Sequence, residues 1–106
     1  MVQIQSQDDI LTVHLEGELT YENTTDIKDE IKSHILSNTK KVIIELSKLD
    51  LIDSSGVGVF ISLLRKMNGE GVSLAAPQPR IARVFEITKL DQIIPIYKTL
   101  DEALAK

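Results

Sequence analysis

Hydrophobic and polar residues alternate near the start of the chain, and this pattern predicts two half-buried strands. Val2 and Ile4 alternate with polar neighbours, and the same spacing of two returns over residues 10–15. Alternation of this kind puts the apolar side chains on one face of a strand and the polar ones on the other. The polar residues 6–9 lie between the two runs, so we expect a turn there.

The pattern then changes to a helical one. Gly17 and the polar residues 20–23 end the alternation, and apolar residues follow at every fourth position: Ile27, Ile31 and Ile35, with Leu36 beside them. This spacing predicts an amphipathic helix with one buried face. Polar residues that can cap or end this helix stand on both sides of it: Asn23, Thr24 and Thr25 before it and Asn38 after it.

From residue 41 onward, strand-like and helical segments alternate. Strands are expected at three places: 41–46, covered on both faces, 72–75, and 93–97, which Pro95 restricts to an edge. Helices are expected before the second of these strands, after Pro79 and after Thr99, which opens a capping box. The inward face of the first of these helices is expected to hold Val57, Phe60, Ile61, Leu64 and Met67.

The resulting order of elements, β-β-α-β-α-β-α-β-α, predicts an α/β fold. Strands that alternate with helices pair in parallel, with the helices packed on the sheet. The pattern contains about five strands and about four helices, and the 106 residues are enough for one hydrophobic core and too few for two. We therefore expect a single domain over residues 1–106 with a mixed sheet.

Composition excludes several classes of protein. The formal charge of −4 is unsuited to a nucleic-acid surface, which needs clustered Lys and Arg. The absence of Cys excludes disulfides, thiol catalysis and Cys-based zinc sites. The sequence shows no signal peptide, and no apolar run reaches the roughly 20 residues that span a bilayer. We expect a soluble cytoplasmic protein without a nucleic-acid or membrane partner.

The segment from residue 51 to residue 60 is where we expect chemistry. Ser54, Ser55, Gly56 and Gly58 interrupt its apolar run at the predicted start of a helix, where backbone N–H groups are unpaired. One of the serines is expected to cap that helix. The glycines let the helix pack close to the sheet or let another molecule approach its backbone, since each disfavours a helix by roughly 1 kcal/mol relative to Ala.

Catalysis by this chain has little support in the sequence. The two histidines, His14 in a strand and His34 in a helix, lack a metal-binding spacing, and we expect structural or solvent-facing roles for both. The residues around Ser54 do not form the Gly-x-Ser-x-Gly elbow of a hydrolase. Residues 56–58 lack the third glycine of a nucleotide-binding fingerprint. We therefore predict no enzyme activity and no cofactor.

Residues 53–58 read Asp-Ser-Ser-Gly-Val-Gly after apolar Leu51 and Ile52. This segment resembles the phosphorylation-site motif of the STAS family, whose small members are bacterial anti-sigma factor antagonists. Further matches follow the same order along the whole chain: Gly17-Glu18-Leu19, Ile44-Glu45-Leu46 with Leu49, and Lys89-Leu90-Asp91 before Ile94. The resemblance implies the fold of that family and a role in the regulation of transcription.

The resemblance also implies a phosphorylation switch. In the family, the unmodified protein binds an anti-sigma factor that is also a serine kinase, and thereby releases a sigma factor. The kinase phosphorylates the serine after the motif aspartate, which is Ser54 here, and a serine phosphatase reverses this. Ser55 is the neighbour of the acceptor, and Asp53 shapes the local geometry and charge. Family members commonly carry an acidic residue after Gly-Glu-Leu, where this chain has Thr20, with Glu18 and Glu22 nearby.

The partner-binding face implied by the resemblance combines the loop after the second strand, the turn at residues 53–58 and positions of the following helix that we expect to be exposed. Its residues are Glu18, Thr20, Tyr21, Asn23, Asp53, Ser54, Ser55, Gly56, Val57, Gly58, Val59, Ser62 and Leu63. Two alternatives stay open. One is a STAS module that binds another protein or a small ligand such as a nucleotide without phosphorylation, and the other is a small serine hydrolase.

Overall fold

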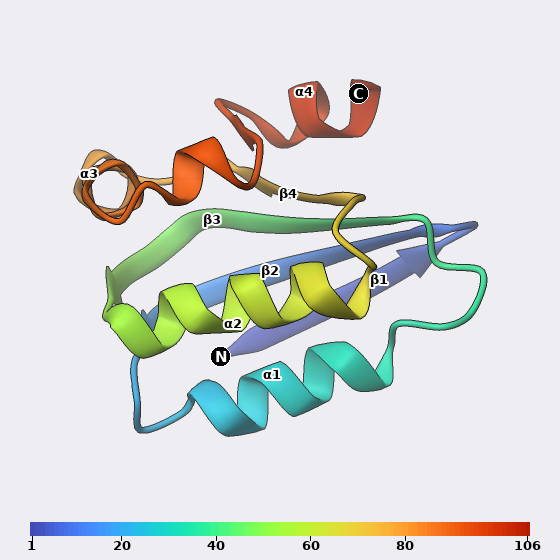
Figure 1. The fold of residues 1–106 in the computed structure, drawn as a ribbon, viewed down its shortest axis with the longest axis horizontal. Helices are drawn as coiled ribbons and strands as arrows, with labels where there is room; N and C mark the ends of the chain where they lie inside the picture. Colours follow the sequence, from blue (N-terminus) through green and yellow to red (C-terminus); the bar gives the residue numbers. More distant parts are fainter.

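Five strands form one sheet, and the computed structural model describes all residues, 1–106 (Figure 1). In sheet order, which is also chain order, the strands are β1 (Val2–Gln7), β2 (Ile10–Leu19), β3 (Lys41–Ile52), β4 (Val72–Ala75) and β5 (Ile96–Tyr97). The helices are α1 (Thr24–Ser33), α2 (Ser54–Lys66), α3 (Pro79–Ile87) and α4 (Leu100–Ala105), with a 3-10 turn η1 (Leu90–Gln92) before β5. The predicted α/β class and the predicted numbers of strands and helices are confirmed.

The sheet is mixed, as expected. β1 pairs with β2 in antiparallel fashion, and every other neighbouring pair is parallel. The tight turn between β1 and β2 places Asp8 in the left-handed region, at a φ of 57°. Asp tolerates this conformation better than most residues, because its short polar side chain can hydrogen-bond locally. The helices supply the crossovers that parallel strands require.

The helices cover the two faces of the sheet differently (Figure 1). α1 and α2 lie over the face that carries the main core, which includes Val42 and Ile44 of β3. The residue between them, Ile43, points to the other face and packs in a small cluster with Ala75 and with Ala103 of α4. None of the four helices combines the length and the hydropathy needed to cross a bilayer.

β2 and β3 extend further than alternation predicts. The expected ends, at residues 15 and 46, are both too early, because β2 continues to Leu19 and β3 to Ile52. Two register shifts in their pairing each add one extra residue to β3. Such bulges break the spacing of two, so Leu46, Leu49 and Ile52 are all buried although they are three residues apart. With this irregular pairing, both strands continue as far as the start of α2.

α1 ends earlier than its apolar spacing predicts. Its last residue is Ser33, so Leu36 lies outside the helix and is 61% exposed. Ser33 Oγ donates to the Glu30 carbonyl at 2.6 Å, and Thr39 Oγ1 accepts from the Leu36 backbone N–H at 2.9 Å. Local side-chain bonds of this kind compete with helical ones. The chain therefore turns toward β3 before the expected stop at Asn38.

The buried face of α2 differs from the expected one. Phe60 points inward as predicted, but Ile61 and Leu64 are only half-buried. Val59 and Leu63, which we expected at exposed positions, are 2% and 0% exposed. The expectation was wrong because α2 contacts α1 as well as the sheet, so its buried arc is turned toward α1.

The elements after β4 follow the sequence closely. Pro79 is the first residue of α3, and Thr99 caps α4 by accepting from the Glu102 backbone N–H at 3.1 Å. β5 is an edge strand, as Pro95 indicated, but it begins at Ile96 rather than at residue 93. The residues before Pro95 form η1 instead, a turn that the sequence did not predict.

Candidate functional site

The candidate site lies where β2 and β3 end side by side. Leu19 and Ile52, their last residues, are paired neighbours, and the Asp53 backbone N–H donates to the Leu19 carbonyl at 3.3 Å. The 20–23 loop leaves β2 here, and the turn at residues 53–58 leaves β3. Carboxyl ends of neighbouring parallel strands are the usual location of binding sites in α/β sheets. The structure thus brings together the two segments that the sequence singled out.

Asp53, and not a serine, caps α2. Its Oδ1 accepts from the backbone N–H groups of Ser55 at 2.9 Å and of Gly56 at 3.1 Å. The expectation that Ser54 or Ser55 caps the helix is therefore wrong, because β3 ends one residue earlier than a serine cap requires. Ser54 becomes the first residue of α2 and is exposed, while Ser55 is half-buried.

The 20–23 loop is held by side-chain hydrogen bonds. Asn23 Oδ1 accepts from the Thr20 backbone N–H at 3.0 Å, and Asn23 Nδ2 donates to the Glu18 carbonyl at 2.8 Å. The second carboxylate oxygen of Asp53 accepts from the Tyr21 backbone N–H at 3.0 Å, which links the loop to the start of α2. The Tyr21 side chain itself is 75% exposed.

The two glycines of the turn differ in their surroundings. A Cβ at Gly56 would lie 2.5 Å from Ile52 Cγ1 and 2.8 Å from the Leu19 carbonyl oxygen. Gly56 is therefore explained by close packing of α2 against the strand ends, and it is buried. A Cβ at Gly58 would meet no atom within 4 Å, and this glycine is exposed. Only Gly58 leaves the backbone of α2 open to another molecule.

The predicted partner-binding residues divide into two groups. Those at the surface or half-buried are Glu18, Thr20, Tyr21, Asn23, Asp53, Ser54, Ser55, Gly58 and Ser62, and we call them the Ser54 face. The other four, Gly56, Val57, Val59 and Leu63, are buried in the core beneath this face. The expected exposure of Val59 and Leu63 is therefore wrong, while contact of these residues with a partner stays a prediction.

Two further residues, both of α1, belong beside the Ser54 face, and a third exposed residue, Leu51, lies near the end of β3. Leu51 is 44% exposed, because Ile52 beside it points into the core beneath α2 and Leu51 therefore points to the other face of the sheet. Thr25 and Lys28 of α1 line a small hollow with Ser55, Gly58 and Ser62 of α2. Only the α1 residues have a signal in the sequence, since Thr25 and Lys28 are polar and lie off the apolar stripe of that helix. Nothing in the sequence pattern marks Leu51 as exposed.

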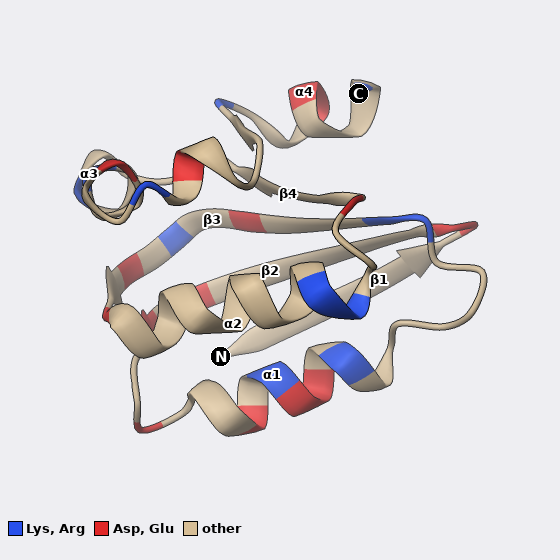
Figure 2. Ribbon diagram, viewed as in Figure 1, with Lys and Arg blue, Asp and Glu red and all other residues tan.

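The charge around the site is uneven. Figure 2 shows α2 without a charged residue until its last turn, where Arg65 and Lys66 lie. Acidic residues surround the start of the helix: Glu18, Glu22, Asp50 and Asp53. Basic residues at the C-terminus of a helix and an acidic cap at its N-terminus both match the helix dipole. The exposed surface of α2 from Ser54 up to its last turn is consequently neutral, with an acidic border at the strand ends and with Lys28 of α1 across the hollow.

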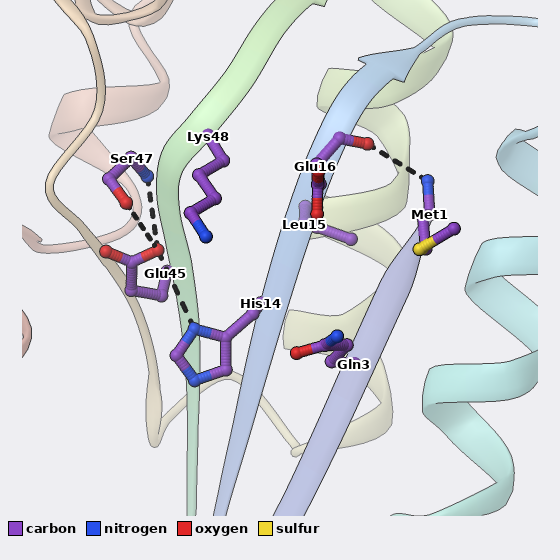
Figure 3. A pocket seen from close by; sticks show the side chains of 8 residues that line it. All are labelled: Met1, Gln3, His14, Leu15, Glu16, Glu45, Ser47 and Lys48. Atoms are coloured by element: carbon purple, nitrogen blue, oxygen red, sulfur yellow. Dashed lines mark hydrogen bonds and ion pairs between the residues drawn. The ribbon is translucent and has the colours of Figure 1, made fainter.

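A second hollow, of about 290 Å³, lies on the sheet face opposite α1 and α2 (Figure 3). Glu45 Oε1 there accepts from the Ser47 backbone N–H at 3.2 Å and from Ser47 Oγ at 3.0 Å, and it lies 3.8 Å from His14 Nδ1. Through these contacts the Glu45 side chain supports the bulge of β3. No group of three or more His, Cys, Asp or Glu side chains that could hold a metal ion occurs in the structure.

Comparisons with known proteins agree with this fold. The model of the STAS domain family matches residues 1–103. A Thermotoga neapolitana protein with the provisional name of an anti-sigma factor antagonist is 33% identical over 100 residues, which is 92% of this chain and 88% of that protein. A crystal structure from Thermotoga maritima, whose protein has the same provisional name, superimposes with a TM-score of 0.89 at 29% identity and covers 98% of this chain and 92% of that one.

A third comparison concerns the anti-sigma factor antagonist SpoIIAA, solved in its unphosphorylated form. It superimposes with a TM-score of 0.84 at 25% identity and covers 98% of this chain and 93% of that one. Both superpositions cover nearly the whole of the two chains compared, so these proteins have the same fold as this chain. The match of the family model over nearly the full length shows that the chain belongs to the STAS domain family.

Proposed function

We propose that this chain is an anti-sigma factor antagonist, that its unmodified form binds an anti-sigma factor serine kinase, and that Ser54 is the phosphate acceptor. The observation that carries the proposal is the exposed position of Ser54 as the first residue of α2. Because Asp53 makes the cap, the Ser54 hydroxyl has no part in holding the helix. Its modification therefore leaves the fold intact.

The surface around Ser54 suits a protein partner. Tyr21 is a large aromatic side chain, 75% exposed, and its backbone is joined to the start of the neutral surface of α2. Exposed aromatic and aliphatic side chains in a surface poor in charge are typical of the centre of a protein interface. The hollow beside Ser55 has a volume of about 100 Å³. Ligand pockets usually have about 300 to 1,000 Å³, so this hollow supports a protein partner rather than a nucleotide.

Phosphorylation acts on this surface through charge. The kinase transfers the γ-phosphoryl group of ATP to Ser54 Oγ, the hydroxyl proton is released, and ADP leaves. The phosphate brings a charge of about −1.5 to −2. The start of α2 tolerates an anion because its N–H groups and the helix dipole favour negative charge. The partner meets this charge next to the acidic border, and about 3 kcal/mol of repulsion lowers its affinity more than a hundredfold.

The hydrolase alternative has no support in the geometry. A nucleophilic serine needs a general base within hydrogen-bonding reach. His14 lies on the sheet face opposite α2, and His34 follows the far end of α1, whereas Ser55, next to Ser54, shares a hollow with Thr24 and Thr25 at the beginning of α1. Labelling of Ser54 by a fluorophosphonate probe would revive this alternative.

The first test is phosphorylation by the cognate kinase. Incubation with ATP is expected to add one phosphate, which mass spectrometry locates at Ser54. Ser54→Ala should abolish the modification and keep the affinity for the partner. The matched control, Ser55→Ala, changes the neighbouring hydroxyl and should still be modified. Phosphate found only at another residue would contradict the assignment.

A second measurement separates regulation from stability. Ser54→Asp adds a negative charge at the first position of α2, which the helix dipole favours. We expect an affinity for the partner at least tenfold lower and a melting temperature within about 2 °C of the unmodified protein, because an exposed change of this kind costs under about 0.5 kcal/mol. An unfolded variant would show that Ser54 has a structural role.

A further inference from the structure

The Asp53 carboxylate is shared between two segments that are far apart in the sequence. Its Oδ1 accepts from the backbone N–H groups of Ser55 and Gly56, at 2.9 and 3.1 Å, and its Oδ2 accepts from the Tyr21 backbone N–H at 3.0 Å. Each hydrogen bond to an ionised carboxylate is stronger than a neutral one. One side chain thus holds both the start of α2 and the 20–23 loop.

The other hydrogen bonds of the loop do not reach α2. Asn23 bonds with Thr20 and Glu18, so these contacts shape the loop internally. The bond from Tyr21 to Asp53 joins residues 20–23 to residues 53–58, and no second hydrogen bond does so. Tyr21 is the one aromatic residue of the Ser54 face, and this hydrogen bond joins its backbone N–H to the residue that caps α2.

Ser54 stands directly beside this carboxylate, and a phosphate on it competes for the same donors. The N–H groups at the start of a helix attract a phosphate, and here those of Ser55 and Gly56 are the ones bonded to the Asp53 carboxylate. Two anions at one helix start repel each other, and the phosphate, with about −1.5 to −2 charges, is the stronger of the two. The Asp53 carboxylate is then displaced, and its bond to Tyr21 is the one that breaks most easily because the loop is exposed.

From this geometry we propose that Asp53 is a positioning residue that transmits the state of Ser54 to the 20–23 loop. In the unmodified protein Asp53 holds Tyr21 in place for the partner, and phosphate at Ser54 releases the loop. The inference rests on the proposed function in one respect, that Ser54 is the modified residue. It goes beyond that function because it assigns part of the loss of affinity to the loop and not to repulsion alone.

Asp53→Asn separates the two tasks of the carboxylate. Asn caps a helix about as well as Asp, so its side-chain oxygen keeps the bonds to Ser55 and Gly56. The amide nitrogen of the new side chain then faces the Tyr21 backbone N–H. Both groups are donors, so the hydrogen bond to Tyr21 is lost. Asp53→Ser is the second variant, because a serine also caps but presents only one oxygen. Asn23→Ala is a control that alters the loop without touching this link.

The experiment is amide hydrogen exchange measured by NMR on the isolated protein. In both Asp53 variants the Tyr21 amide is expected to exchange at least tenfold faster, while Ser55 and Gly56 exchange as in the unmodified protein. Unchanged exchange at Tyr21 in the Asn variant would overturn the structural link. Melting curves of both variants check that the comparison is made on folded protein.

A second experiment uses protein in which phosphoserine is incorporated at position 54 during translation, so no kinase is needed. In this protein the Tyr21 amide is expected to exchange at least tenfold faster than in unmodified protein. Adding Asp53→Asn to the phosphoserine protein should give no further increase in the exchange rate, because the effects of two changes that act through one contact are not additive. Protection of Tyr21 that persists with phosphoserine would overturn the inference. The proposed function fails separately, if the cognate kinase does not modify Ser54 or the phosphate leaves partner affinity unchanged.

Discussion

At the scale of single residues, Gly56 and Gly58 have opposite roles within one helical turn. Gly56 is required by space, since a Cβ there meets the Leu19 carbonyl oxygen at 2.8 Å, and a backbone atom cannot move aside cheaply. Gly58 has open space around it, so its lack of a side chain has no packing reason. Neighbouring glycines of one motif therefore serve the core and the surface respectively.

Alanine at these two positions should change stability in opposite directions. Gly56→Ala is expected to lower the free energy of unfolding by about 1 to 3 kcal/mol because it overpacks the strand ends. Gly58→Ala should raise it by about 0.5 to 1 kcal/mol through better helix propensity. Urea unfolding followed by circular dichroism measures both. Equal effects of the two substitutions would contradict this account of the glycines.

At the scale of elements, α2 shows how packing partners select the buried face of a helix. Apolar residues occur on most sides of this helix, so its sequence allows more than one inward face. Contact with α1 as well as with the sheet selects the arc that contains Val59 and Leu63. Ser62 lies between them in sequence and lines the hollow at the surface.

Substitutions of Leu63 and Ser62 test whether the buried arc of α2 contributes to stability. Leu63→Ala should destabilise the protein by about 2 to 5 kcal/mol, as expected for loss of a fully buried leucine. Ser62→Ala should stay within about 0.5 kcal/mol, because it removes only a hydroxyl near the surface. Thermal unfolding of both variants gives the comparison. A small effect at Leu63 would show that its burial contributes little.

At the scale of the whole molecule, the two ends of the helical layer differ. The Ser54 face lies at one end of α2, and the hollow that includes Leu36, Met67 and Asn68 lies at the other. The helix has 13 residues, so the two ends are about 20 Å apart. Both ends expose an apolar side chain, Tyr21 at 75% and Leu36 at 61%. Of these two side chains, only Tyr21 belongs to the end of the molecule with the proposed phosphate acceptor.

Substitutions at the two ends should distinguish partner binding from general surface hydrophobicity. Tyr21→Ser is expected to weaken binding of the anti-sigma factor at least thirtyfold, about 2 kcal/mol, as for an aromatic anchor of an interface. Leu36→Ser removes a comparable exposed side chain and should leave the affinity unchanged. Calorimetric titration measures both. Equal losses would place the interface over a wider area than the Ser54 face.

The sequence by itself determined the α/β class, the order of the elements and the segments of the site. Spacings of two and of about four residues report local periodicity, and local periodicity is what these properties depend on. The resemblance of residues 53–58 to a known motif also directed attention to Ser54 before any contact was known. Pro79 and Thr99 marked helix starts for the same local reason, since each acts on its own neighbours.

Tertiary structure decided the properties that depend on distant neighbours. The bulges of β3 come from its pairing with β2, and where the paired strands end Asp53, and not a serine, caps α2. The packing of α1 buries Val59 and Leu63, which periodicity alone places equally well outside. The bond between Asp53 and Tyr21 spans 32 residues. No local pattern encodes such contacts, because they exist only when two separate strand ends are brought side by side.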